Sequence, residues 1–254
     1  MRALQIPFIL LIFSLLAAAT NVYAQEELDG YDSIADRVLL KKELTGGIVV
    51  HNLGMGVNFR KGVNKTFFNS RIFEMELVNM KHPKQVRMVT NYAYAKGFFY
   101  GKLNHVYMLR AGYGFKKLLN RKPYWGGIEL RAVYLGGFSL AISKPVYLYF
   151  WYENDPYHYY MQRYDPDNTK HSLDLIYGRA PFLNGFDEIK VYPGIYARGG
   201  LNFEFGTLNS KIRSLEVGGV VEYFPIPIPI MASNPENSFF LTFYLNFSLG
   251  KRYN

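Results

Sequence analysis

The sequence predicts an all-β fold, a transmembrane antiparallel β-barrel of about eight strands with long extracellular loops. Three observations lead to this prediction: an export signal at the amino terminus, long stretches in which apolar and polar residues alternate, and charged residues on the polar side of those stretches. The chain has 254 residues, of which 49% are hydrophobic and 19% charged, and this composition excludes a disordered chain.

Residues 1–24 have the pattern of a secretory signal peptide. A single Arg2 precedes an apolar run from Phe8 to Ala19, and the small residues Val22 and Ala24 mark a cleavage site. The run is shorter than the roughly 20 residues that a membrane-spanning helix needs. We therefore expect residues 25–254 to form the exported β-barrel domain. The absence of cysteine excludes disulfides, thiolate metal sites and a cysteine-based lipid anchor.

Seven stretches alternate with the period of a β-strand. In the stretch FEMELV, Phe73, Met75 and Leu77 oppose Glu74 and Glu76. A soluble sandwich also alternates, but charged residues opposite a continuous row of large apolar side chains favour a strand between lipid and a polar lumen. The residues expected to form a charge network in the lumen are Glu74, Glu76, Arg110, Glu129, Arg131, Arg198, Glu204, Glu216 and Glu222.

The connections between the stretches alternate in length, as in outer-membrane barrels. Short polar turns are expected at KGVNKT, KKLLNRKP and TLNSK, and long connections around residues 80–100, 143–189 and 225–237. The first strand is expected within IADRVLLKKEL, which makes eight strands. KPVYLYFWY and HSLDLIYG either pair above the membrane or raise the count to ten. The run PIPIPI should be an extended outer connection, because proline cannot donate to a sheet ladder.

The strand number bears on function, because eight strands enclose only enough space for their own side chains. We therefore interpret the inward charges as a structural plug, held by ion pairs. A small channel, with these charges as its selectivity lining, is the alternative that ten strands would favour.

The long middle connection is rich in aromatic residues between two Asp-Pro turns. Tyrosine and tryptophan supply large contact areas, so this segment is a candidate partner-binding loop. The alternative is that the rings belong to the aromatic girdle at the membrane surface. The residues are Trp151, Tyr152, Tyr157, Tyr159, Tyr160 and Tyr164.

The first long connection is basic. Its residues Lys81, Lys84, Arg87 and Lys96 would contact the phosphates of lipopolysaccharide if the loop is external. The formal net charge of +9 does not make nucleic acid a partner, because the compartment outside the cell membrane holds none.

The sequence shows no catalytic motif, no metal-ligand spacing and no cofactor signature, so no catalytic residue, metal or cofactor is expected. His171 is followed by Ser172 and Asp174, but adjacent residues of a strand point to opposite faces, and His82 has no nearby acid. We expect a non-enzymatic protein. A lipid-modifying or proteolytic barrel enzyme with His171 or His82 at its outer rim is the less favoured alternative.

Three segments resemble small outer-membrane β-barrel proteins of the Bacteroidota, a functionally uncharacterised group: VNMKHPKQ at 78–85, FFYGKLNH at 98–105 and GFDEIKVYPGIYARGGLNFEFG at 185–206. The resemblance extends over most of the mature chain and implies the fold and an outer-membrane location. It transfers no catalytic residue. Because machines for barrel insertion and protein export in this phylum resemble one another in carrying small barrel subunits, it also implies a role as an accessory subunit of an envelope complex.

Overall fold

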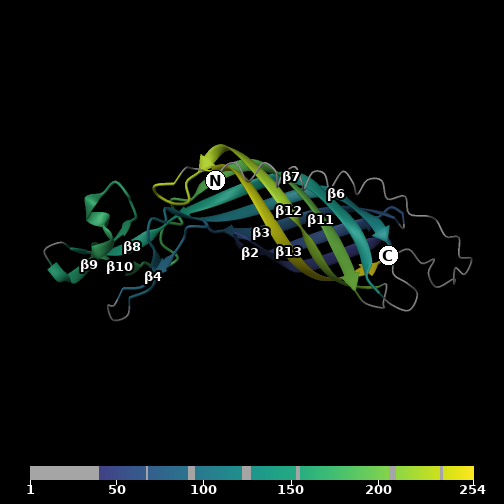
Figure 1. The fold of residues 1–254 in the computed structure, drawn as a ribbon, viewed down its shortest axis with the longest axis horizontal. Helices are drawn as coiled ribbons and strands as arrows, with labels where there is room; N and C mark the ends of the chain where they lie inside the picture. The colour runs from purple at the N-terminus through teal and green to yellow at the C-terminus, as the bar shows by residue number, and fades with distance from the viewer. Residues whose placement is uncertain are drawn as a thin grey trace, which may run out of the picture. The chain divides into compact units, whose positions relative to one another are not determined.

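A computed structural model describes residues 40–66, 68–90, 95–121, 127–152, 155–205, 210–234 and 237–254. Eight strands close into an antiparallel barrel in the order β1-β13-β12-β11-β7-β6-β3-β2 (Figure 1). The predicted all-β transmembrane barrel is confirmed, with eight strands in its wall. The strands are β1 (Lys42–His51), β2 (Gly54–Asn64), β3 (Asn69–Met80), β6 (Asn104–Asn120), β7 (Glu129–Pro145), β11 (Lys190–Phe205), β12 (Lys211–Ile228) and β13 (Asn237–Tyr253). The predicted signal peptide lies outside the described residues.

The first and last strands close the barrel by pairing with each other. The ladder between β1 and β13 runs from the pair Lys42 and Tyr253 to the pair His51 and Tyr244. Closure leaves the wall without an exposed sheet edge, which is a condition for crossing a bilayer with strands. We call the end that holds Lys42 and Tyr253 the terminal end, and the opposite end the loop end. Within the described ranges, no helix has the length and apolar character needed to cross a membrane.

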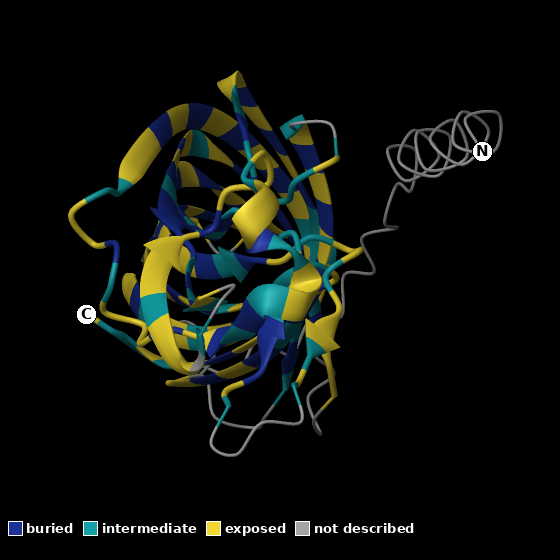
Figure 2. Ribbon diagram, turned by 90° about the vertical axis from the view of Figure 1, so that its left-hand side faces the viewer, coloured by how far each residue is buried: buried dark blue, intermediate teal, exposed yellow. Residues whose placement is uncertain are grey.

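The barrel wall has the burial pattern of a membrane protein. Along β3 every second residue is exposed, and the exposed residues include Phe73, Met75 and Leu77, whereas Glu74 and Glu76 are buried. Figure 2 shows the same alternation of exposed and buried residues along the other barrel strands. Large apolar side chains therefore face outward, and the acidic side chains of the wall face inward. This arrangement suits lipid surroundings and would be unfavourable in water.

The long middle connection forms a sheet of its own at the loop end. The strands β8 (Tyr147–Tyr152), β9 (Asp155–Arg163) and β10 (Ile176–Arg179) pair in the order β10-β8-β9, and we call them the outer sheet (Figure 1). The chain passes almost directly from β7 into β8, and the N–H of Val146 still donates to the carbonyl of Leu103. The two segments KPVYLYFWY and HSLDLIYG therefore supply strands that pair outside the barrel, and the alternative of ten strands in the wall is wrong.

The remaining elements of the outer connections are short. The pair β4 (Arg87–Met88) and β5 (Phe98–Phe99) lies in the first long connection, and two 3₁₀ turns, η3 (Thr169–His171) and η4 (Leu173–Leu175), precede β10. Phe98, Leu148, Phe150 and Ile176 form a buried cluster that joins these elements to the outer sheet. The outer connections therefore have an apolar core of their own.

Three predicted boundaries are wrong. The first strand is Lys42–His51 and overlaps IADRVLLKKEL only at Lys42, Glu43 and Leu44. It extends to a tight turn at Asn52 and Leu53, after which β2 begins at Gly54. The second and third corrections concern strand ends. Lys116 to Asn120 of KKLLNRKP belong to β6, and Lys61 to Asn64 of KGVNKT belong to β2, because their alternation continues.

The run PIPIPI is only partly a connection. Strand β12 continues to Ile228, which pairs with Asn237 after an irregularity in the register that follows Tyr223. Such an irregularity accommodates prolines, since the extended backbone there need not donate regular ladder hydrogen bonds. Beyond it, the carbonyl of Ile230 accepts hydrogen bonds from Leu103 and Asn104, and both isoleucines are buried. The segment thus covers the lumen at the loop end.

Candidate functional site: the lumen and the outer sheet

All nine charged residues assigned to the lumen from the sequence are buried, and they lie in two layers together with further charged partners. Five barrel strands, β2, β3, β6, β11 and β12, supply the middle layer, because inward positions recur at every second residue of each strand. This middle layer consists of Arg60, Glu74, Glu76, Arg110, Arg198, Glu216 and Glu222.

Arg198 is at the centre of this middle layer. Its Nη1 atom donates to Glu74 Oε1 at 2.7 Å and to Glu76, and its Nε atom lies 3.5 Å from Glu216 Oε1. The guanidinium carbon is 3.8 Å from the ring centroid of Tyr244, a cation–π contact. The side chain of Arg198 is fully buried, so these contacts replace its hydration.

Two further arginines complete the middle layer with bidentate contacts. Arg60 donates to Glu216 through Nη1 at 2.5 Å and Nη2 at 2.8 Å, and also to Glu74. Arg110 donates to Glu222 through Nε at 3.0 Å and Nη2 at 2.7 Å, and also to Glu76. Fork-shaped pairing of this kind fixes geometry as well as charge.

A second polar layer lies nearer the terminal end. Arg252 donates to both oxygens of Glu204, at 2.8 and 2.5 Å, and Lys116 Nζ lies 3.4 Å from Glu43 Oε1. Glu129 and Arg131 pair with each other. The sequence reasoning missed Arg60, Glu43, Lys116 and Arg252, although the inward parity of their strands was the signal that could have found them.

Toward the loop end, the lumen is filled with apolar side chains. Met108, Tyr192, Phe224, Ile228 and Phe240 belong to one buried cluster that spans the barrel, and Phe224 packs edge-on against Phe240 with ring centroids 5.9 Å apart. The sequence analysis did not anticipate this layer, because it assigned only polar residues to the lumen. An apolar layer above two ion-paired layers leaves the interior packed with side chains.

The outer sheet is built around stacked rings. Tyr159 of β9 stacks on Tyr177 of β10, with centroids 4.9 Å apart and planes at 8°, and Trp151 of β8 meets both rings edge-on. Tyr152, Tyr157 and Tyr159 are exposed, Tyr157 by 86% of its surface. The assignment of Tyr164 to the partner surface is wrong, because this side chain is buried beside Tyr100, and Trp151 and Tyr160 are only half-exposed.

Strand β9 forms one edge of the outer sheet. Its register on β8 pairs Trp151 with Tyr159 and Tyr149 with Met161, so these four side chains share one face. The other face contributes Leu148 and Phe150 to the buried cluster. Within the parts of the chain that the structure describes, β9 pairs with β8 alone, so one row of its backbone groups is available for a further strand.

The two histidines considered as catalytic candidates, His171 and His82, are engaged in packing and hydrogen bonds with neighbouring residues. His171 is buried and stacks on Phe150 with centroids 4.1 Å apart, and its Nδ1 atom accepts from the N–H of Asp165. His82 accepts a hydrogen bond from the N–H of Lys84 through Nδ1, and desolvation together with the Lys84 charge lowers the pKa of His82. No cluster of three metal-ligating side chains occurs among the residues that the structure describes.

The DPDN segment, Asp165 to Asn168, forms the expected turn. Its Asn168 side chain accepts from the N–H of Lys170 at the start of η3.

The basic residues of the first long connection are exposed at Lys81, Lys84, Arg87 and Lys96. Lys84 Nζ also donates to Asn234 Oδ1 at 2.8 Å. A fifth cation of this connection, Lys102, is buried and donates to Gln85. Burial, with the nearby charges of Lys81 and Arg179, lowers the pKa of Lys102 to about 8.

We compared the chain with known proteins. No protein-family model matches the sequence, and no curated protein matches it. Two crystal structures of Ail, the attachment invasion locus protein of Yersinia pestis, match the fold. The structure in complex with the heparin analogue sucrose octasulfate has a TM-score of 0.39 and 9% identity, and the other has 0.37 and 8%. Each alignment covers 85% of this chain and 100% of Ail. No residue role or ligand is transferred from them.

Proposed function

We propose that the protein is a non-enzymatic outer-membrane scaffold, an accessory subunit of an envelope complex, in which the barrel is the membrane anchor and the outer sheet binds a protein partner. The observation that carries this proposal is the exposed aromatic edge strand β9, with Tyr157 exposed by 86% and Tyr159 by 50%. A signal peptide at 1–24, and a place among the small barrels of the Bacteroidota, are parts of the same proposal.

The packed lumen supports an anchor in preference to the alternative of a channel. The middle layer alone engages Arg60, Arg110 and Arg198 with four glutamates, and the apolar layer above it includes Phe224 and Phe240. Solute passage would require breaking buried ion pairs and moving buried rings, and both are costly.

The outer sheet suits the addition of a strand from a partner. Backbone groups along the free edge of β9 would give affinity, and the rings of Trp151 and Tyr159 would give contact area and selectivity. Residues 146–189 contain three basic and seven acidic residues, a net charge of −4. The partner segment is therefore extended, apolar at alternate positions and basic.

The packing of the histidines supports a role without catalysis. His171 is enclosed between Phe150 and Tyr164, and its ring nitrogens are engaged by Asp165, Asn168 and Gln162. A general base needs access to a substrate proton. His171 acts in this proposal as a packing residue of the outer connections.

The first long connection adds a lipid contact. Residues 81–103 contain Lys81, Lys84, Arg87, Lys96 and Lys102 and no acidic residue. In outer-membrane barrels the end opposite the termini is extracellular, so these cations would contact lipopolysaccharide phosphates.

Photo-crosslinking in cells tests the partner surface. A photoreactive phenylalanine analogue at Tyr157 or Tyr159 should give one adduct of discrete mass containing a second protein. The matched control position is Leu183, which is 77% exposed in the same outer connection but outside the outer sheet. A double substitution of Tyr157→Ser and Tyr159→Ser should abolish copurification in mild detergent, whereas Leu183→Ser should not. Equal cross-linking at all three positions, or recovery only as a monomer, would refute the proposal.

A further inference from the structure

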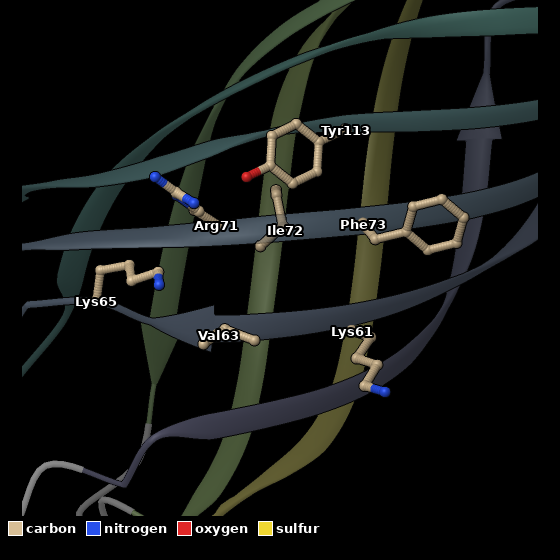
Figure 3. Close-up of a pocket in the computed structure, with 7 residues that line it drawn as sticks. All are labelled: Lys61, Val63, Lys65, Arg71, Ile72, Phe73 and Tyr113. Atoms are coloured by element: carbon tan, nitrogen blue, oxygen red, sulfur yellow. The ribbon is translucent and has the colours of Figure 1, made fainter.

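A groove lies on the outer wall of the barrel near the terminal end (Figure 3). Three cations and two aromatic rings line it, together with Val63 and Ile72. The cations are Lys61 of β2, Lys65 of the turn that follows, and Arg71 of β3, and the rings are Phe73 of β3 and Tyr113 of β6. Among the residues that the structure describes, no acidic side chain lines this groove.

The strand register explains why these side chains meet. Val63 pairs with Arg71, Lys61 pairs with Phe73, and Phe73 pairs with Tyr113, so all five point outward from neighbouring strands. Lys61 and Arg71 are diagonal neighbours, whose backbones are separated by roughly 7–8 Å. In Figure 3, the Tyr113 hydroxyl is on the Arg71 side of the groove. In Figure 3 the charged ends of Lys61 and Arg71 point to opposite sides of the groove. Both side chains are exposed and long enough to turn toward one small anion between the strands.

The charge on the barrel exterior is of a single sign at this end. Every acidic residue of the eight barrel strands is buried in the lumen. The exposed basic residues of the barrel strands near the terminal end form a belt, which consists of Lys42, Lys61, Arg71, Lys117, Lys211, Arg213 and Lys251. Within the described ranges, Lys61, Lys65 and Arg71 form no ion pair with any residue of the chain. The groove concentrates three cations of this region without a protein anion to neutralise them.

The position of the groove along the barrel axis indicates the kind of anion that it meets. The outward residues that follow Arg71 along β3 are Phe73, Met75 and Leu77, and those that precede Lys61 along β2 are Met55, Val57 and Phe59. The cations thus begin where the apolar band ends, at the level of lipid headgroups. Because the terminal end of an outer-membrane barrel faces the periplasm, these headgroups belong to phospholipids and not to lipopolysaccharide.

We propose that this groove binds one anionic glycerophospholipid of the periplasmic leaflet. Lys61, Lys65 and Arg71 hold the phosphate by charge-assisted hydrogen bonds. An acyl chain lies along Val63 and the ring of Phe73, and the Tyr113 hydroxyl donates to a headgroup oxygen. The groove recognises the headgroup and the acyl chain together, so its ligand is a lipid and not free phosphate.

The test uses the purified full-length mature chain in an uncharged detergent, titrated with phosphatidylglycerol or phosphatidylcholine and observed by native mass spectrometry. The groove variant carries Lys61→Gln, Lys65→Gln and Arg71→Gln. The matched control carries Lys211→Gln, Arg213→Gln and Lys251→Gln, which removes the same charge from the same end of the barrel. Each cation near an anionic headgroup contributes about fivefold in affinity, so the groove variant should bind the first phosphatidylglycerol about a hundredfold more weakly.

The control variant should keep the affinity for the first phosphatidylglycerol within about threefold, since its cations lie outside the groove. Arg71→Lys should retain more affinity than Arg71→Gln because it keeps the charge. Inorganic phosphate at the same concentration as the lipid should not displace it. Equal weakening of the two triple variants, equal binding of the two lipids by the wild type, or displacement by inorganic phosphate would each overturn the proposal. Retained heat-modifiable migration on gels shows that each variant is folded.

Discussion

Replacing Arg198 by methionine should strongly destabilise the barrel. The side chain is fully buried and contacts Glu74, Glu76 and Glu216. Its removal takes one arginine contact from each of these glutamates and leaves four glutamates against two arginines in the middle layer. Breaking a buried ion pair from one side costs about 3–5 kcal/mol. Each of these glutamates keeps one other arginine, Arg60 or Arg110, so we expect about 3 kcal/mol, the lower end of that range.

The assay is reversible urea unfolding in lipid vesicles, followed by tryptophan fluorescence. For a slope of about 3 kcal/mol per molar urea, the loss lowers the midpoint by roughly 1 M. The control Arg213→Met removes an exposed arginine of the neighbouring strand β12 and should change the free energy of unfolding by less than about 0.5 kcal/mol. In a double-mutant cycle, Glu76→Gln should be less costly in the Arg198→Met background, with a coupling of about 1 kcal/mol or more. An Arg198→Met midpoint equal to that of the wild type would refute the reasoning.

Three further predictions concern other layers of the molecule. Phe224→Ala should cost about 3–5 kcal/mol in the same urea assay, because the ring is fully buried against Phe240, and a loss below 1 kcal/mol would mean that the apolar layer is not closely packed. Gly200→Ala should cost about 1–3 kcal/mol, because its Cβ would lie 2.6 Å from Tyr244 Oη, and Tyr244→Phe should recover part of this loss if that contact is the cause. Lys102 has a pKa of about 8 in the folded protein and 10.5 as its ordinary value, so the unfolded chain binds more protons between these values and stability should rise from pH 8 to pH 10.5. In Lys102→Met the free energy of unfolding should increase less between pH 7.5 and pH 9.5, as measured by urea titrations. An increase equal to that of the wild type would show that groups other than Lys102 cause it.

The wall of the barrel was predictable because one physical rule acts on every strand. Alternation assigned Glu74, Arg110 and Glu222 to the lumen, and the structure buries all three. Arg60 is at an inward position by the same rule and could have been included in the predicted charge network of the lumen. The outward apolar residues change parity across the tight turn at Asn52, from Ile48 and Val50 to Met55 and Val57. Alternation alone did not locate this turn, because the buried Val49 has the same parity as Met55 and hides the change.

The filling of the lumen near the loop end was not predictable from alternation. There both faces of a strand are apolar, as at the exposed Phe239 and the buried Phe240 of β13. Alternation gives no signal where the inward and outward side chains have the same polarity. The burial of Tyr164 was equally invisible, because it depends on packing against Tyr100, which is distant in the sequence. The pairing of β8 with β10 joins segments that are distant in the sequence, so alternation could not predict it. The sequence therefore left open whether the barrel has eight or ten strands.

Single-cysteine scanning along β13 tests the central claim, an apolar exterior and a packed lumen, most directly. The chain contains no cysteine, so each introduced thiol gives an unambiguous signal. Nitroxide labels at Leu241, Phe243, Leu245 and Phe247 should collide with lipid-dissolved oxygen, whereas labels at Thr242 and Asn246 should be shielded from both oxygen and a water-soluble nickel complex. Access of the nickel complex to Thr242 and Asn246 would show a water-filled lumen, and access to the outward residues would show that this wall does not face lipid.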